Sequence, residues 1–101
     1  MSIKQERIGP LLVMTGEAQR QEFDAKDATP VRVAFPTAFR RPPLVQLGIV
    51  GLDDNNNQAL RLRVQALNVS EEGFDLQMYT WHTTKLFQVV VQWTALGESR
   101  F

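Results

Sequence analysis

Cysteine is absent from the sequence, which excludes disulfide bonds, thiolate zinc sites and cysteine nucleophiles. This absence is compatible with a reducing compartment. There is a single histidine, and no GxSxG, HExxH or glycine-rich phosphate loop occurs. Catalysis therefore has few groups to work with, and we expect a protein that is not an enzyme and that uses no cofactor and no metal ion.

Neither sign of charge is in excess, because 11 basic residues balance 11 acidic ones. Such a chain has no general attraction to phosphate backbones or anionic lipids, so nucleic acid is not an expected partner. Long apolar runs are also missing. The run at residues 11–14 is too short for a signal-peptide core or a membrane span. We expect a soluble protein without membrane insertion, either cytoplasmic or secreted by a non-classical route.

The length of 101 residues fits one domain, residues 1–101, and the hydrophobic content of 44% supports one packed core. A domain of this size is only marginally stable alone. It is therefore well suited to oligomerisation.

Apolar residues recur at every second position in several segments and almost nowhere at helical spacing, which predicts β-strands. The clearest example is residues 60–67, where apolar residues alternate with Arg61, Arg63 and Gln65. The same pattern predicts strands at 31–35, 44–52, 74–79 and 86–96, with a further strand around 11–14.

The strands at 74–79 and 86–96 also predict which side chains enter the core, because alternate residues of a strand point to one face. The inward-facing residues are expected to be Phe74, Leu76 and Met78 in one strand, and Phe87, Val89, Val91, Trp93 and Ala95 in the other.

The connections have the composition of turns: residues 40–43 contain two prolines, 53–57 are polar, and 70–73 end in glycine. Residues 15–29 are polar and charged, and we expect them to form a loop that carries binding groups. Short strands separated by such turns predict an all-β fold, a sandwich or barrel.

Two segments, RPPLVQLGIVGLD and LRLRVQALNVSEEGFDLQMYTWHTTKLFQVVVQW, resemble the H-type lectin domain, the family of the snail agglutinins and of the C-terminal domain of the discoidins. The resemblance covers residues 31–95, and its most specific piece is YTWHTTK at 79–85, followed by an aromatic residue at Phe87. It implies a six-stranded antiparallel β-sandwich that assembles as a homotrimer, or as a hexamer of two stacked trimers. It also implies that galactose or N-acetylgalactosamine binds in clefts between subunits.

Carried over position by position, the resemblance implies a sugar site formed by Asp24, Arg61, Trp81, His82 and Phe87, with Glu22 beside them. In the family, the aspartate and the arginine hydrogen-bond sugar hydroxyls, while the tryptophan–histidine pair and a following tyrosine line the cleft. The chain departs from the snail agglutinins in three ways. Phe87 replaces that tyrosine and lacks its hydroxyl, Glu22 replaces a glycine, and the cysteines that link the snail proteins are absent.

These residue types suit a monosaccharide, which offers vicinal hydroxyls and apolar C–H faces. A carboxylate accepts from adjacent hydroxyls, the planar guanidinium donates to a pair of oxygens, and an indole covers a C–H face. Single sites of this kind bind weakly. A trimer gains roughly 10²–10⁴-fold by effective concentration on a glycan-covered surface.

Plainer interpretations of the same residues stay open. By periodicity alone, Trp81 and His82 are a turn aromatic and a solvent-facing histidine that follow a strand. Arg61 and Arg63 share the wet face of a strand, where arginine commonly serves solubility. The position of Asp24 in the match rests on spacing.

Two further motifs, an acidic loop and a glycosylation pattern, are explained by ordinary structural roles. Residues 53–57 lack the glycine and the bidentate glutamate of a calcium loop, and an Asx-rich hairpin turn accounts for them. The glycosylation pattern at 68–70 fits a strand end equally well. The alternative function is a structural trimerisation or attachment module of a larger fibre or adhesin, with the sugar site degraded by the departures at Phe87 and Glu22.

Overall fold

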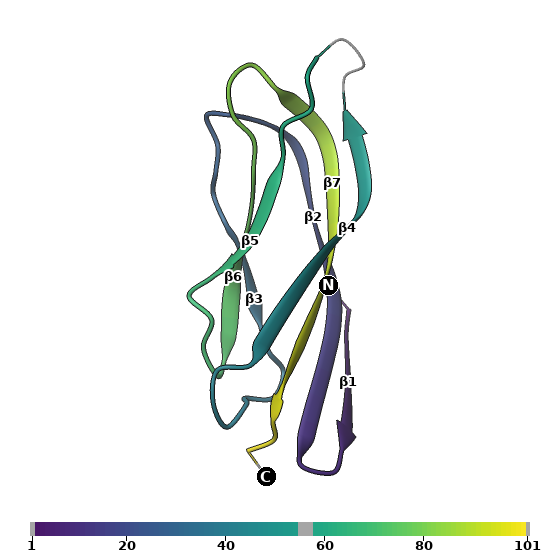
Figure 1. Cartoon of the computed structure of the whole chain (residues 1–101), viewed down its shortest axis with the longest axis vertical. Helices are drawn as coiled ribbons and strands as arrows, with labels where there is room; N and C mark the ends of the chain where they lie inside the picture. The colour runs from purple at the N-terminus through teal and green to yellow at the C-terminus, as the bar shows by residue number, and fades with distance from the viewer. Residues whose placement is uncertain (1, 55–57, 101) are drawn as a thin grey trace.

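The computed structural model describes residues 2–54 and 58–100, which form an elongated body of 50 × 20 × 17 Å. Its seven strands pair antiparallel in two sheets (Figure 1). Within residues 2–54 and 58–100 there is no helix that is long and apolar enough to cross a membrane. The strands are β1 (Ile3–Ile8), β2 (Leu11–Asp24), β3 (Val31–Ala34), β4 (Leu44–Asp54), β5 (Arg63–Leu67), β6 (Gly73–Tyr79) and β7 (Lys85–Glu98).

The larger sheet has the order β1-β2-β7-β4 and the smaller one the order β3-β6-β5. The core lies between them, with the Trp93 ring 5.6 Å from the Phe74 ring and 6.0 Å from the Phe35 ring. The all-β prediction is confirmed, and so are most of the predicted core positions. These are Phe74, Leu76, Met78, Val89, Val91, Trp93 and Ala95, all fully buried.

The number of strands is seven and not the expected six, because β1 pairs with β2 along the edge of the larger sheet. Only Ile3 of β1 packs against the core, while the rest of the strand is exposed. With just one side chain in the core, β1 lacks the apolar alternation by which the other strands were recognised.

The expected loop at residues 15–29 is also wrong, since β2 continues to Asp24 and pairs with β7 over nearly its whole length. The inward-facing positions of this stretch are occupied by Gly16 and Ala18, whose small size hides the alternation. Gly16 is required to be small, because a Cβ there would lie 2.6 Å from the buried ring of Trp93.

The predicted strand at 60–67 is shorter than expected, because β5 begins at Arg63. The strand predicted at 44–52 is present and extends to Asp54 as β4. Of the expected turn at 53–57, residues 55–57 lie outside the described residues. β4 is an edge strand of the larger sheet, and several of its apolar side chains remain exposed.

In the two long strands, β2 and β7, the alternation of buried residues shifts by one position where the strands approach the same end of the sheet. In β2 the buried residue after Ala18 is Phe23, and in β7 the buried residue after Leu86 is Val89. Glu22 has a left-handed backbone there, with φ of 48°, and its position in the register lies opposite Phe87.

Phe87 is the extra residue of a β-bulge, because Asp53 and Asp54 of β4 pair with Gln88 and Leu86 of β7. The bulge turns the phenyl ring out of the core, and 41% of Phe87 is exposed. The prediction that Phe87 packs inward with Val89 is therefore wrong.

Candidate functional site

The residues of the predicted sugar site gather at one end of the sandwich, where β2 ends and β7 begins, at the top of Figure 1. Asp24 pairs with Lys85, and Glu22 lies opposite Phe87. Trp81 and His82 lie in the turn from β6 to β7, and Arg61 lies just before β5. We call this group the site end: Glu22, Asp24, Arg61, Trp81, His82 and Phe87.

The turn after β6 presents aromatic rings to solvent. The Thr84 amide donates to the Trp81 carbonyl at 3.4 Å, and His82 adopts a left-handed backbone with φ of 61°. The Trp81 ring is tilted against the Tyr79 ring, with centroids 6.2 Å apart. Since 41% of Trp81 is exposed and His82 is also exposed, both side chains are accessible.

Arg61 is held against this turn by two threonine hydroxyls. The Thr84 hydroxyl accepts from Arg61 Nη1 at 2.9 Å and donates to the Ala59 carbonyl at 2.8 Å. The Thr80 hydroxyl donates to the Arg61 carbonyl. Thr84 is fully buried and Thr80 is 4% exposed, so these bonds lie beneath the surface. They hold both the guanidinium and the backbone carbonyl of Arg61.

A third side chain extends this arrangement. The Gln58 amide donates to the Lys85 carbonyl at 2.6 Å, and its oxygen accepts from the Lys85 amide at 2.9 Å. The Gln58 side chain thus makes the two hydrogen bonds to Lys85 that the backbone of a paired strand would make. This explains how residues 58–61 stay beside β7 without belonging to a strand.

Thr80 and Thr84 contribute to the site, although neither is among the residues predicted for it. One signal was present, because Thr84 shares the inward parity of Leu86 in the next strand. A buried hydroxyl requires hydrogen-bond partners. The sequence alone does not name Ala59 and Arg61 as those partners.

Asp24 stands on the other side of the site end and is half-buried. One carboxylate oxygen accepts from the Lys26 amide at 2.9 Å, which forms an Asx turn. The Asp24 carbonyl accepts from the Asp27 amide at 3.2 Å. These bonds orient the carboxylate and leave its second oxygen without a partner among the described residues.

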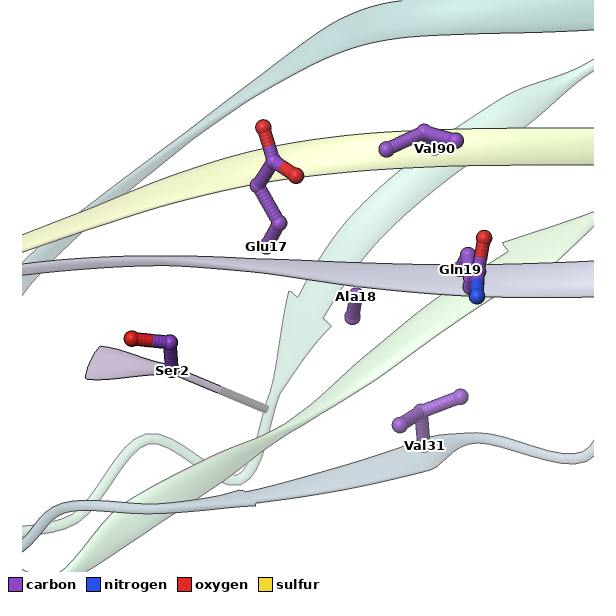
Figure 2. A pocket seen from close by; sticks show the side chains of 6 residues that line it. All are labelled: Ser2, Glu17, Ala18, Gln19, Val31 and Val90. Atoms are coloured by element: carbon purple, nitrogen blue, oxygen red, sulfur yellow. The ribbon is translucent and has the colours of Figure 1, made fainter.

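One hollow in the surface lies away from the site end. It has a volume of about 380 Å³ and is lined by Ser2, Glu17, Ala18, Gln19, Val31 and Val90 (Figure 2). It lies near the start of β1, where β2 continues past its partner strand. No member of the site end lines it. No cluster of His, Asp or Glu suited to a metal ion occurs in residues 2–54 or 58–100.

The sequence pattern of the H-type lectin domain matches residues 30–96 of this chain. The matched range includes Arg61, Trp81, His82 and Phe87 and excludes Glu22 and Asp24. A protein of Fuscovulum blasticum called "ATP synthase subunits region ORF 7" is 32% identical over 68 residues. The aligned part is 67% of this chain and 59% of that relative, so the chain spans less than two thirds of the relative's length.

Solved structures share the fold. Recombinant discoidin II of Dictyostelium discoideum superposes with a TM-score of 0.77 at 22% identity, over 91% of this chain and 39% of that one. An N-truncated R1-type pyocin tail fibre has a TM-score of 0.61 at 14% identity, over 96% of this chain and 86% of that one. At these identities the likeness concerns the fold alone.

Proposed function

The chain belongs to the H-type lectin domain family, and from this premise we propose that it binds sugars of the galactose or N-acetylgalactosamine type through the site end, without catalysing a reaction. Membership in the family supports a carbohydrate-binding fold. The observation that carries the proposal is the hydrogen bond from Arg61 to the buried hydroxyl of Thr84, because it connects Arg61 to the turn that contains Trp81. A charged fork and an exposed aromatic face are thereby held in one hydrogen-bonded unit.

In this proposal Asp24 and Arg61 hydrogen-bond adjacent sugar hydroxyls, each bond contributing about 1.5–3 kcal/mol. Trp81 covers a C–H face or an N-acetyl methyl group. His82 and Phe87 line the edge of the site, and Glu22 adds a carboxylate acceptor beside them.

We also propose that the protein is a trimer, or a stack of two trimers, in which a neighbouring subunit supplies the second wall of the sugar cleft. Exposed apolar side chains on the edge strand β4, and one just before Arg61, support this assembly, because they leave an apolar surface uncovered. They are Ile49, Val50, Leu52 and Leu60, each 42–55% exposed.

The test is calorimetric titration with N-acetylgalactosamine beside a glycan array. Arg61→Ala and Trp81→Ala are expected to abolish binding without changing the oligomeric mass. The matched control is Arg63→Ala, because Arg63 is exposed on β5 and has no place in the site end. A wild-type trimer that binds no galacto-configured sugar would contradict the proposal.

A structural attachment module is the second candidate, and the pyocin tail fibre favours it, because the fold of this chain covers 86% of that fibre chain. The replacements at Phe87 and Glu22 point the same way. This candidate predicts a stable trimer that ignores sugars. The mass measurement and the titration together separate the two functions.

A further inference from the structure

Arg20 is a charged residue on the inner side of β2, with only 11% of its side chain exposed. Arginine is seldom buried unless its charge and its donors have partners. Here Nη2 forms an ion pair with the Asp27 carboxylate at 2.7 Å, and Nη1 donates to the Asp27 carbonyl at 3.0 Å and to the Met78 carbonyl at 2.8 Å. The guanidinium also lies over the Phe23 ring, 4.2 Å from its centroid.

The acceptors of Arg20 lie in two segments that adjoin the site end, the loop after β2 and the strand β6. Asp27 lies in the turn that begins at Asp24, and its amide donates to the Asp24 carbonyl at 3.2 Å. Met78 belongs to β6, the strand that leads into the Trp81 turn. One guanidinium therefore joins the loop after β2 to a strand of the opposite sheet.

A second contact crosses the same gap, because the Gln77 amide donates to the Ala28 carbonyl at 2.9 Å. The loop itself has little apolar packing, since residues 25–30 are all exposed. Its position thus depends on polar contacts of this kind, with Arg20 making the largest share.

We propose that Arg20 is a positioning residue of the sugar site, which sets the separation between the Asp24 carboxylate and the turn that carries Trp81. This inference rests on the function proposed above. Arg20 lies beneath the surface and does not touch the sugar. Arginine suits the task because its planar fork reaches the loop and β6 together, whereas the point charge of lysine does not. Binding groups need placement within about 0.5 Å.

The test compares Arg20→Met, which keeps an unbranched apolar side chain but removes the charged fork and its contact with the Phe23 ring, with Arg20→Lys. For Arg20→Met, we expect the Kd for N-acetylgalactosamine to rise about tenfold or more, as for the loss of one charge-assisted hydrogen bond. Amide hydrogen exchange of residues 24–30 should accelerate, and the oligomeric mass should not change. Arg20→Lys should recover part of the affinity.

The matched control is Arg32→Met. It removes the ion pair between Arg32 and Asp75, whose charged atoms are 3.4 Å apart and which lies outside the site end. This variant should bind sugar like the wild type. A purely structural role for Arg20 predicts a lower melting temperature with an unchanged Kd in the folded protein. That result would overturn the proposal.

If Arg20→Met fails to fold, Asp27→Asn decides the question, because it removes the ion pair and retains the bonds to the two carbonyls. It should accelerate exchange in residues 24–30 and weaken sugar binding, and an unchanged Kd would overturn the proposal. A wild type that binds no sugar would instead remove the proposed function. In that case the exchange rates of the Arg20 variants alone show whether Arg20 fixes the loop.

Discussion

The Phe87 ring faces solvent because the residue is the extra one of a bulge, with 41% of it exposed. We predict that Phe87→Tyr tightens the binding of N-acetylgalactosamine about fivefold, because a new hydroxyl adds one neutral hydrogen bond of about 1 kcal/mol. Stability should not change, since the hydroxyl remains hydrated in the free protein. Calorimetry on both proteins measures the effect. Equal affinities would show that the ring edge does not face the ligand.

Thr84 offers a second test at the scale of single residues. Thr84→Val keeps the shape of the side chain but leaves the Ala59 carbonyl and one Arg61 donor without their partner. We predict a loss of about 1–3 kcal/mol in the free energy of unfolding and weaker sugar binding. Thr84→Ser retains the hydroxyl and serves as the control. If the valine and serine variants bind sugar equally well, Thr84 does not orient the guanidinium.

Among the strands, the pairing of β2 with β7 depends on the contact between Gly16 and Trp93. A Cβ at Gly16 would lie 2.6 Å from the indole ring, which is fully buried and cannot move aside easily. We predict that Gly16→Ala lowers the free energy of unfolding by about 1–3 kcal/mol, as overpacking does. Urea unfolding gives the value.

Gly48→Ala is the control for this prediction, because Gly48 also lies in a strand of the larger sheet and a Cβ there would meet no atom within 4 Å. It should be neutral or stabilising by about 0.4–1 kcal/mol, since alanine reduces the entropy of the unfolded chain. The opposite order of the two variants would contradict the contact described for Trp93.

Two carboxyl groups of the fold have a lowered pKa, that of Asp27 in the loop after β2 and that of Asp75 in β6. Hydrogen bonds from Thr29, with a smaller effect of Arg20, hold the pKa of Asp27 below its ordinary value of 3.8. A hydrogen bond from Asn68, assisted by Arg32, lowers the pKa of Asp75 in the same way. Both groups are more acidic in the folded chain than in the unfolded chain.

A lowered pKa in the folded state stabilises the fold above the unfolded value of 3.8, and this contribution disappears as the pH falls through the folded pKa. We therefore predict that the urea midpoint falls as the pH is lowered below 3.8, the unfolded value. The double variant Asp27→Asn, Asp75→Asn should show a shallower fall. Identical slopes for both proteins would mean that other carboxyl groups govern the acid response.

For the whole molecule, the proposed assembly places the unpaired edge of β4 between subunits. We predict that Val50→Lys converts the oligomer into folded monomers, because Val50 is 55% exposed on that edge and a buried lysine would lack a partner. Sedimentation velocity measures the mass. Ile8→Lys is the control, since Ile8 is 61% exposed on β1, at the opposite edge of the same sheet. An unchanged mass for Val50→Lys would exclude β4 as the interface.

Much of the fold was predictable because large apolar side chains at alternate positions have to be buried. The alternation predicted β3, β5, β6, most of β4 and most of β7, and it indicated the core around Trp93. It missed β1 and most of β2, where small or polar residues occupy the strands. Their place in the fold follows from backbone hydrogen bonds to partner strands, which no local pattern records.

For the candidate site, the sequence supplies the residue types, whereas their sugar-binding roles are implied by the family resemblance and remain predictions. The sequence by itself determined that the chain is all-β, which strands form its centre and that a tryptophan–histidine turn follows β6. Only the tertiary structure decided that Phe87 turns outward, that Thr84 holds Arg61, and that Arg20 reaches Met78. The last two contacts join residues 23 and 58 positions apart in the chain. Such contacts exist only once the strands have paired and the sheets have packed, whereas burial of an apolar stripe is already dictated by its period.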